Sequence, residues 1–225
     1  MNKVIATLLF LAGLIISQSC KQNPVKEIVT IPDGKVGLIG YGSLTSKKQM
    51  ESQLGKKYEG PIRVIHLEDY QRYWNFIAPN DLEHPPVNNI IKCTTGNDTI
   101  IPETLVALNI QETDGKSMNC CFFIIDEEDL AKIDITEKGY KRIDVSESIR
   151  EFQVDHGKVY AYQALPEYHM EPTINQPNKN AIVKLYLGFL NTSFENLGEE
   201  YKREFEESTA NYHASLELDC YLTTE

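Results

Sequence analysis

Two short stretches of this sequence combine residues suited to binding an anion and to moving protons. The first is Tyr41-Gly42-Ser43-Leu44, which follows the apolar run Val36–Ile39 and Gly40. The apolar run predicts a buried strand, and glycines on both sides of Tyr41 predict a tight turn. Glycine at these positions permits positive φ and lets another group lie close to the bare backbone.

A helix is expected directly after this turn. Ser46-Lys47-Lys48-Gln49 fits a capping box, so we predict a helix from Lys47 to about Leu54 that ends at Gly55. A strand, a glycine turn and a helix N-terminus in succession aim several backbone N–H groups at one point, where an anion is stabilised. The alternative is a tight strand-to-helix connection that binds nothing.

The second stretch supplies a carboxylate. Glu137 lies between an acidic segment predicted to be helical and the predicted strand Tyr140–Val145. Partial burial and the negative end of that helix would both raise the pKa of Glu137 toward a value useful for proton transfer. The alternative is a surface glutamate paired with Lys138 or Arg142, since surface glutamates are far commoner than catalytic ones.

Together the two stretches resemble the gamma-glutamylcyclotransferase-like superfamily. In that family a Tyr-Gly-Ser turn follows the first strand, and a Glu-x-x-Tyr-x-Arg segment later joins a helix to another strand. Here these are Tyr41-Gly42-Ser43-Leu44 and Glu137-Lys138-Gly139-Tyr140-Lys141-Arg142. The resemblance covers roughly Val36 to Leu190 and rests on the order and spacing of the motifs as well as on their residues.

The resemblance implies a fold and an activity. The fold is α+β, a small, mostly antiparallel β-barrel, closed or nearly closed, with helices packed outside and with the turn and the glutamate at one rim. The activity is cyclisation of a γ-glutamyl amine or peptide to 5-oxoproline, with release of the amine and without a cofactor. Tyr41, Gly42, Ser43 and Leu44 would then bind the substrate, and Glu137 would be the catalytic general base and acid.

The chain departs from the family pattern in two places. Many members carry an asparagine inside the Tyr-Gly-Ser turn, whereas Leu44 directly follows Ser43 here. Members also have a glycine at the start of the strand before the catalytic helix, where this chain has Asn119-Cys120. The first departure leaves the substrate class open, and the second affects local packing.

The N-terminus predicts export and lipid anchoring. Lys3, the apolar run Val4–Ile16 and Ser17-Gln18-Ser19-Cys20 resemble a bacterial lipoprotein signal, in which the cysteine is acylated. The run is too short for a confident transmembrane helix, which needs about 20 residues. We therefore expect a signal peptide at 1–19, a tether at 20–28 and one domain at 29–225, on a lipid-anchored protein of the cell envelope that faces the periplasm or exterior. An uncleaved anchor and ordinary secretion are the alternatives.

Composition excludes some partners. The chain carries 22 basic and 33 acidic residues, a formal net charge of −11, and no basic patch, so we expect no nucleic-acid partner. Cys93, Cys120, Cys121 and Cys220 lack metal-ligand spacing, and Asp81, Glu83 and His84 are predicted to form a solvated loop, so no metal site is expected. Export permits disulfides, but the sequence predicts no particular bridge.

Further elements follow from the apolar patterns. Two separate strands are expected between residues 61 and 77, then a hairpin that reverses at a Thr-Asp-Gly turn, and helices near the C-terminus. The expected strands are Pro61–His66, Arg72–Ile77, Leu105–Ile110 and Asn119–Ile125, with the hairpin turn at Thr113–Gly115, and the expected helices are Ala181–Leu190 and the amphipathic Phe194–Ser208.

Two other functions stay open at this point. The same pocket would serve a non-catalytic lipoprotein that binds an amino-acid-like or cell-wall-derived ligand. Hydrolytic or transfer chemistry on a γ-glutamyl bond of cell-wall peptides is suggested only by the expected compartment. A nucleophilic hydrolase is disfavoured, because no serine or cysteine lies in a recognisable activation motif.

Overall fold

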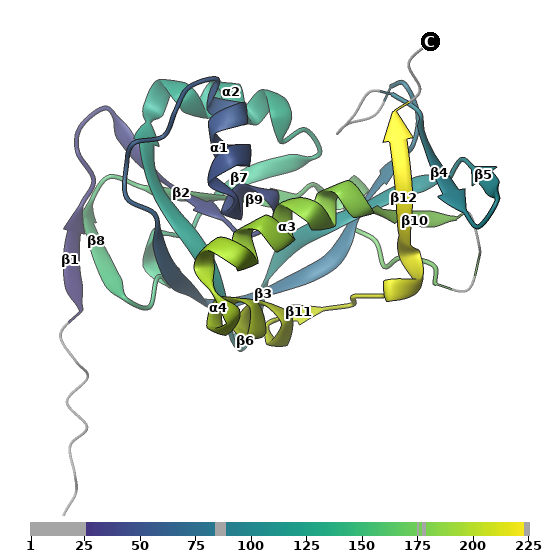
Figure 1. Cartoon of the computed structure of the whole chain (residues 1–225). Helices are drawn as coiled ribbons and strands as arrows, with labels where there is room; N and C mark the ends of the chain where they lie inside the picture. Colours follow the sequence, from purple (N-terminus) through teal and green to yellow (C-terminus); the bar gives the residue numbers. More distant parts are fainter. Residues whose placement is uncertain (1–25, 84–88, 175, 177–178, 223–225) are drawn as a thin grey trace, which may run out of the picture.

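The computed structural model describes residues 26–83, 89–174, 176 and 179–222 (Figure 1). The strands are β1 (Glu27–Thr30), β2 (Lys35–Gly40), β3 (Arg63–Pro79), β4 (Ile91–Thr95), β5 (Asp98–Ile100), β6 (Thr104–Asp126), β7 (Tyr140–Asp144), β8 (Phe152–His156), β9 (Val159–Ala164), β10 (Asn180–Val183), β11 (Thr209–Ala210) and β12 (Glu217–Leu222). The helices are α1 (Lys47–Leu54), α2 (Leu130–Thr136), α3 (Lys184–Leu197) and α4 (Glu199–Glu207), with a short 3₁₀ helix, η1, at Ser43–Thr45.

These elements form an α+β fold around a strongly curled, half-barrel sheet, which confirms the expected fold class. Strand β6 is the central strand of the sheet. β3 pairs with it in antiparallel orientation along one edge, while β2 and β10 pair with opposite ends of its other edge. In Figure 1, α3 crosses in front of the sheet, and α1 and α2 lie together at one end of it. No helix within the described residues is long and apolar enough to cross a bilayer.

The two strands expected between residues 61 and 77 form one strand, and the hairpin expected at Thr113–Gly115 is absent. β3 runs unbroken from Arg63 to Pro79, and β6 passes straight through the Thr-Asp-Gly segment. Asp69 has a φ of 59° and accepts a hydrogen bond from the Gly115 N–H at 2.9 Å. Because residues 113–116 face this single residue, the turn-prone segment makes a bulge between paired strands instead of reversing the chain.

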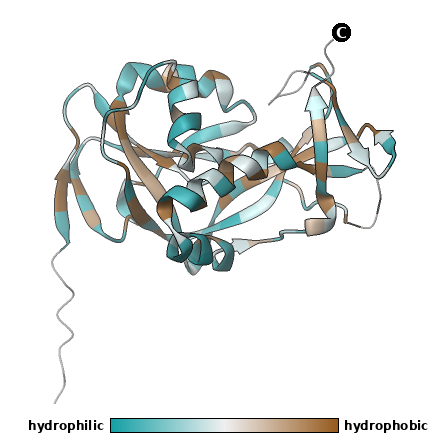
Figure 2. Ribbon diagram, in the orientation of Figure 1, coloured by the Kyte–Doolittle hydropathy of each residue, from teal (hydrophilic) through white to brown (hydrophobic). Residues whose placement is uncertain are grey.

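The C-terminal helices also differ from the expectation. Residues 180–183 form strand β10, and α3 begins only at Lys184. The predicted helix Phe194–Ser208 is split at Gly198, whose φ of 92° ends α3 before α4 starts. α4 is mostly teal in Figure 2, and its buried residues are Tyr201 and Phe205, so it is amphipathic as expected.

The N-terminal boundary and the α1 cap need correction too. Glu27 and Ile28, placed in the tether by the sequence, belong to β1, which pairs in parallel with β8. Helix α1 has the predicted bounds and ends at Gly55 in the left-handed conformation, but the Ser46 side chain makes no capping hydrogen bond. The proposed signal peptide and Cys20 lie outside the described residues.

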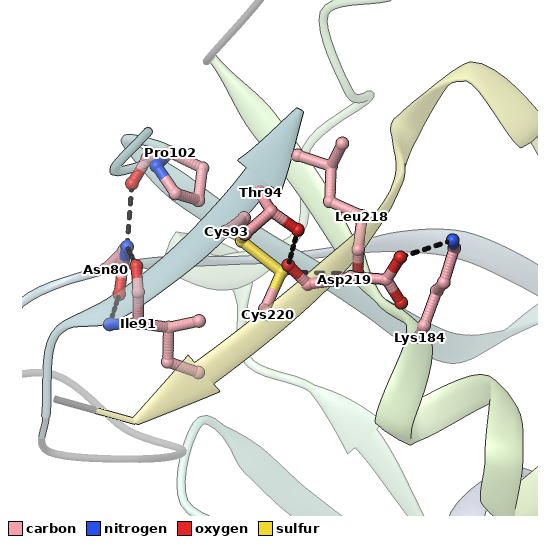
Figure 3. The surroundings of a disulfide bond; sticks show 9 residues. All are labelled: Asn80, Ile91, Cys93, Thr94, Pro102, Lys184, Leu218, Asp219 and Cys220. Carbon is pink, nitrogen blue, oxygen red and sulfur yellow. Dashed lines mark hydrogen bonds and ion pairs between the residues drawn. A yellow bond between two sulfur atoms is a disulfide. The ribbon is translucent and has the colours of Figure 1, made fainter. Parts of the chain in front are cut away.

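A disulfide closes a small subsheet that the sequence did not predict. Cys93 of β4 and Cys220 of β12 face each other in antiparallel register and are bonded (Figure 3). Asn80 stabilises the same part of the fold, because its side-chain amide donates hydrogen bonds to the carbonyls of Ile91 and Pro102 at 2.8 Å each. Cys120 and Cys121 stay reduced and buried.

Arg72 is the most unusual buried side chain. It lies on β3 with no exposed surface, and its Nε donates to the Tyr41 carbonyl at 2.8 Å. Its other nitrogens donate to the Asn119 carbonyl of β6 and, at 3.3 Å, to the Phe205 carbonyl near the end of α4. The guanidinium also lies 3.8 Å from the Phe205 ring centroid. Burial lowers the pKa of Arg72, but a guanidinium starts so high that it stays charged.

We expect Arg72→Met to lower the free energy of unfolding by at least about 3 kcal/mol, because several buried carbonyls lose a charged donor together. Urea unfolding followed by circular dichroism measures the change. The matched control is Arg203→Met, which removes a 62% exposed arginine side chain from α4 and should change stability by less than about 1 kcal/mol. Equal losses in the two variants would contradict the role given to Arg72.

Candidate active site

The turn after β2 needs glycine for reasons of space, not of φ. Neither Gly40 nor Gly42 has a positive φ, contrary to one of the two expectations. A Cβ at Gly40 would lie 2.5 Å from the Leu44 carbonyl oxygen, and one at Gly42 would lie 2.6 Å from the Tyr186 hydroxyl. The expected close approach to bare backbone is therefore confirmed, and the groups that approach are Leu44 and Tyr186.

Hydrogen bonds within the turn, and others from α3 and β9, hold the Tyr41–Leu44 turn in place. The Thr45 N–H and hydroxyl both donate to the Gly42 carbonyl, at 3.0 and 2.7 Å. The Thr45 hydroxyl also meets Ser193 of α3 at 2.9 Å, and the buried Tyr41 hydroxyl donates to the Tyr162 carbonyl at 2.6 Å. The Ser43 N–H is directed at the Tyr186 hydroxyl, so the N–H groups of Gly42 and Leu44 and the Ser43 hydroxyl are the candidate donors to an anion.

The two stretches singled out in the sequence border one cavity. Its volume is about 340 Å³, the size of a small-ligand pocket. Residues 41–44 form one part of the wall and Glu137 another, so the predicted site residues, 93 to 96 positions apart in the sequence, come together in the fold. The remaining wall is largely aromatic and amide side chains: Phe76, Tyr140, Tyr162, Tyr186, Phe189, Gln49 and Gln53.

Glu137 lies where the sequence predicted, at the C-terminal end of α2. Its N–H donates to the Ile133 carbonyl at 2.8 Å, and Gly139, with a φ of 86°, turns the chain into β7. The alternative pairing is absent: Arg142 meets Asp134 at 3.1 Å, whereas Gln53 of α1 donates to the Glu137 carboxylate at 2.9 Å.

Burial raises the pKa of Glu137, and the hydrogen bond from Gln53 partly offsets the rise. The carboxylate keeps some contact with solvent because it borders the cavity, while protein encloses its other sides. Burial was one of the two causes expected from the sequence. A carboxyl group with a raised pKa holds and releases a proton nearer to neutral pH.

Phenols surround this carboxylate. Tyr140 stacks on Phe76 with ring centroids 4.2 Å apart, and its hydroxyl donates to the Leu108 carbonyl at 2.7 Å. Burial, reinforced by the charge of Glu137, raises the pKa of Tyr41 and of Tyr140 well above the ordinary value. The phenols are therefore neutral at any ordinary pH, and Glu137 is the ionisable group of the pocket suited to proton transfer.

Sequence reasoning missed several residues of this wall. Gln49 and Gln53 are four positions apart in α1 and so share a face, a signal that could have singled them out. Tyr140 belongs to the Glu-x-x-Tyr-x-Arg segment but had no role assigned. Tyr186 had no local signal, because it stood in what was taken for an apolar helix.

Comparison with known proteins adds support for the fold. Neither a family model nor a curated protein sequence matches the chain. Among solved structures, YkqA from Bacillus subtilis is 12% identical, with a TM-score of 0.50 over 77% of this chain and 53% of that one. A protein titled gamma-glutamyl cyclotransferase is 13% identical, with a TM-score of 0.46 over 80% and 91%. The glutathione-specific gamma-glutamyl cyclotransferase from yeast is 10% identical, with a TM-score of 0.42 over 80% and 100%.

The likeness to YkqA supports a shared fold and nothing finer. The chain therefore has an α+β fold of the kind seen in YkqA, with a strongly curled sheet. The roles of Glu137 and of residues 41–44 remain predictions.

We expect Gln53→Leu to raise the pKa of Glu137, because the variant loses the hydrogen bond that stabilises the ionised form. A nuclear magnetic resonance titration of the ¹³C-labelled glutamate carboxyl groups follows this directly, without substrate. Gln49→Leu is the control. Gln49 borders the same cavity, but the hydrogen bond to Glu137 comes from Gln53, so the control should leave the pKa of Glu137 unchanged. An unchanged or lowered pKa in Gln53→Leu would refute the assignment.

Proposed function

We propose that this protein is a gamma-glutamylcyclotransferase-type enzyme that converts a γ-glutamyl amine or peptide into 5-oxoproline and a free amine. The observation that carries the proposal is one cavity bordered both by the Tyr41–Leu44 turn and by the partly buried carboxylate of Glu137. The turn is suited to an anion and the carboxylate to proton transfer, and a γ-glutamyl compound presents an α-carboxylate beside an α-ammonium group.

Substrate binding is the larger part of the task. The attacking amine and the γ-carbonyl belong to one molecule, so the protein has to hold the chain folded with these two groups in contact. Such intramolecular geometry contributes about 7–11 kcal/mol to lowering a barrier. In our proposal the N–H groups of Gly42 and Leu44 and the Ser43 hydroxyl bind the α-carboxylate, and Tyr41 and the other aromatic walls hold the folded chain.

Glu137 would perform the proton transfers. Its carboxylate takes a proton from the α-ammonium, and the freed amine attacks the γ-carbonyl carbon to form the new C–N bond. The bond from that carbon to the leaving nitrogen then breaks as Glu137 returns the proton to this nitrogen. Glu137, ionised again, takes the second proton that the ring nitrogen must lose and passes it to the released amine, which leaves as an ammonium ion. The reaction balances without metal or cofactor, and the raised pKa of Glu137 suits a group that must both accept and donate protons.

We expect Glu137→Gln to fold with near-normal thermal stability and to bind substrate, while kcat falls by about 10²–10⁴-fold. Glutamine keeps the shape of the side chain but cannot accept the ammonium proton. Mass spectrometry of 5-oxoproline release from a panel of γ-glutamyl compounds provides the assay. Glu128→Gln, an exposed glutamate near the start of α2, is the matched control and should keep full activity.

Two outcomes would overturn the proposal in different ways. Wild-type turnover by Glu137→Gln would reject this mechanism. If the unmodified protein binds γ-glutamyl compounds but turns over none of them, the protein is a binding lipoprotein that uses the same pocket.

We further propose that the mature protein is lipid-anchored through Cys20 in the cell envelope and faces the periplasm or exterior. The Val4–Ile16 apolar run and the small residues before Cys20 support acylation at that cysteine. The Cys93–Cys220 disulfide independently supports an oxidising compartment, because such bonds are rare in the cytosol. The expected partners are therefore a small γ-glutamyl substrate and, through the lipid, the membrane.

We expect Cys20→Ser to remain an unprocessed precursor or to appear in the soluble fraction, because a hydroxyl does not receive the lipid that the thiol carries. Fractionation, immunoblotting and mass spectrometry of the N-terminus follow the change. A variant that stays membrane-bound with a normally cleaved N-terminus would reject the anchor and leave the cyclotransferase proposal untouched.

A further inference from the structure

A second cavity, of about 280 Å³, lies between α3, α4 and the segment that leads into β12. It opens on a different face of α3 from the Glu137 pocket: Leu190 and Phe194 border this cavity, whereas Tyr186 and Phe189 border the other. Nothing in the proposed cyclotransferase reaction uses it, so what it binds is a separate question.

Four aromatic rings, from Trp74, Phe194, Phe205 and Tyr212, border this second cavity. Trp74 and Tyr212 lie with ring centroids 5.6 Å apart, and Phe194 meets Phe205 edge-on at 5.0 Å. The Trp74 side chain is fixed, since it is 3% exposed and contacts Tyr186 on another side, while Tyr212 is 45% exposed. The cavity therefore presents preformed π surfaces with one accessible aromatic wall.

The charges at this cavity are negative. Glu206 and Glu217 border it, and the described lining includes no lysine or arginine. The Tyr212 hydroxyl donates to one carboxylate oxygen of Glu217, which ties the aromatic wall to the acid. Arg72 lies beyond Phe205, and the carbonyls of Tyr41, Asn119 and Phe205 accept its hydrogen bonds.

We propose that this cavity binds a small organic cation, a substituted ammonium ion with short alkyl groups. Aromatic faces attract such ions through the ring quadrupole, and alkyl substituents bury well against the same rings. The two carboxylates add attraction at the cavity wall, and the volume suits a molecule of a few heavy atoms. The two carboxylates repel an anion, and a neutral apolar ligand gains no electrostatic attraction from them.

Substituted ammonium groups occur both in free molecules and in lipid headgroups, and the structure favours a free molecule. Glu206 of α4 borders the cavity, α4 as a whole carries five glutamates against Lys202 and Arg203, and the whole chain has a formal net charge of −11. These charges repel the phosphate that accompanies an ammonium group in a phospholipid.

Choline and its neutral isostere 3,3-dimethyl-1-butanol test the proposal on the unmodified protein. They differ by the replacement of N⁺ with carbon, so their difference in affinity isolates the charge. Trp74 is the only tryptophan of the chain, so its fluorescence reports on this cavity specifically. We expect saturable binding of choline, at least about fivefold tighter than that of the alcohol and weakened by added salt.

Variants locate the site. Glu206→Gln with Glu217→Gln, and separately Tyr212→Leu, should each weaken choline binding several-fold, while Glu207→Gln, which changes an exposed neighbouring acid, should not. Equal affinity for choline and the alcohol, or no binding of either, would overturn the proposal. Binding of phosphatidylcholine vesicles without binding of free choline would also overturn it, in favour of a membrane contact. None of these results depends on turnover of a γ-glutamyl compound.

Discussion

The buried guanidinium of Arg72 joins the parts of the molecule that define the pocket. From β3 it binds carbonyls at the end of β2, in β6 and near the end of α4, and it lies against the Phe205 ring. A backbone carbonyl carries only a partial charge, so several are needed to replace the water that a buried guanidinium has lost. Because the Tyr41 carbonyl is one of them, the turn that begins the candidate site is held by the same cation that holds α4 to the sheet.

The pocket that contains Glu137 combines neutral phenol side chains with one carboxylate that can gain or lose a proton. The hydroxyls of Tyr41 and Tyr140 donate to backbone carbonyls and that of Tyr162 donates to Asp134, and burial keeps these phenols neutral at ordinary pH. The Glu137 carboxylate is therefore surrounded by neutral dipoles and by aromatic surface, where a charge interacts more strongly than it does in water. Gln53 sets how strongly the ionised form is favoured, so a helix that precedes Glu137 by more than 80 positions tunes its protonation.

The C-terminal segment completes the fold in a way that keeps two cavities apart. α3 contributes Tyr186 to the Glu137 pocket and Phe194 to the aromatic cavity, while β12 returns to the subsheet closed by Cys93–Cys220. That bond joins residues 127 positions apart and so restricts the unfolded chain strongly. A covalent restraint at this corner stabilises a part of the molecule whose own core, around Ile91, Leu105 and Ala181, is small.

The sequence alone determined the local features: the strand before Gly40, the close-packed glycine turn, helix Lys47–Leu54 with its Gly55 end, and Glu137 at a helix terminus. Each follows from side chains within a few residues, through apolar periodicity, glycine geometry or helix capping. Only the tertiary structure decided that β3 and β6 run through their turn-like segments, that Cys93 pairs with Cys220, and that Gln53 instead of Arg142 holds Glu137. The physical reason is that these choices depend on strand register and on contacts between distant segments. Neighbouring residues do not encode those energies, which arise only when the curled sheet brings the partners together.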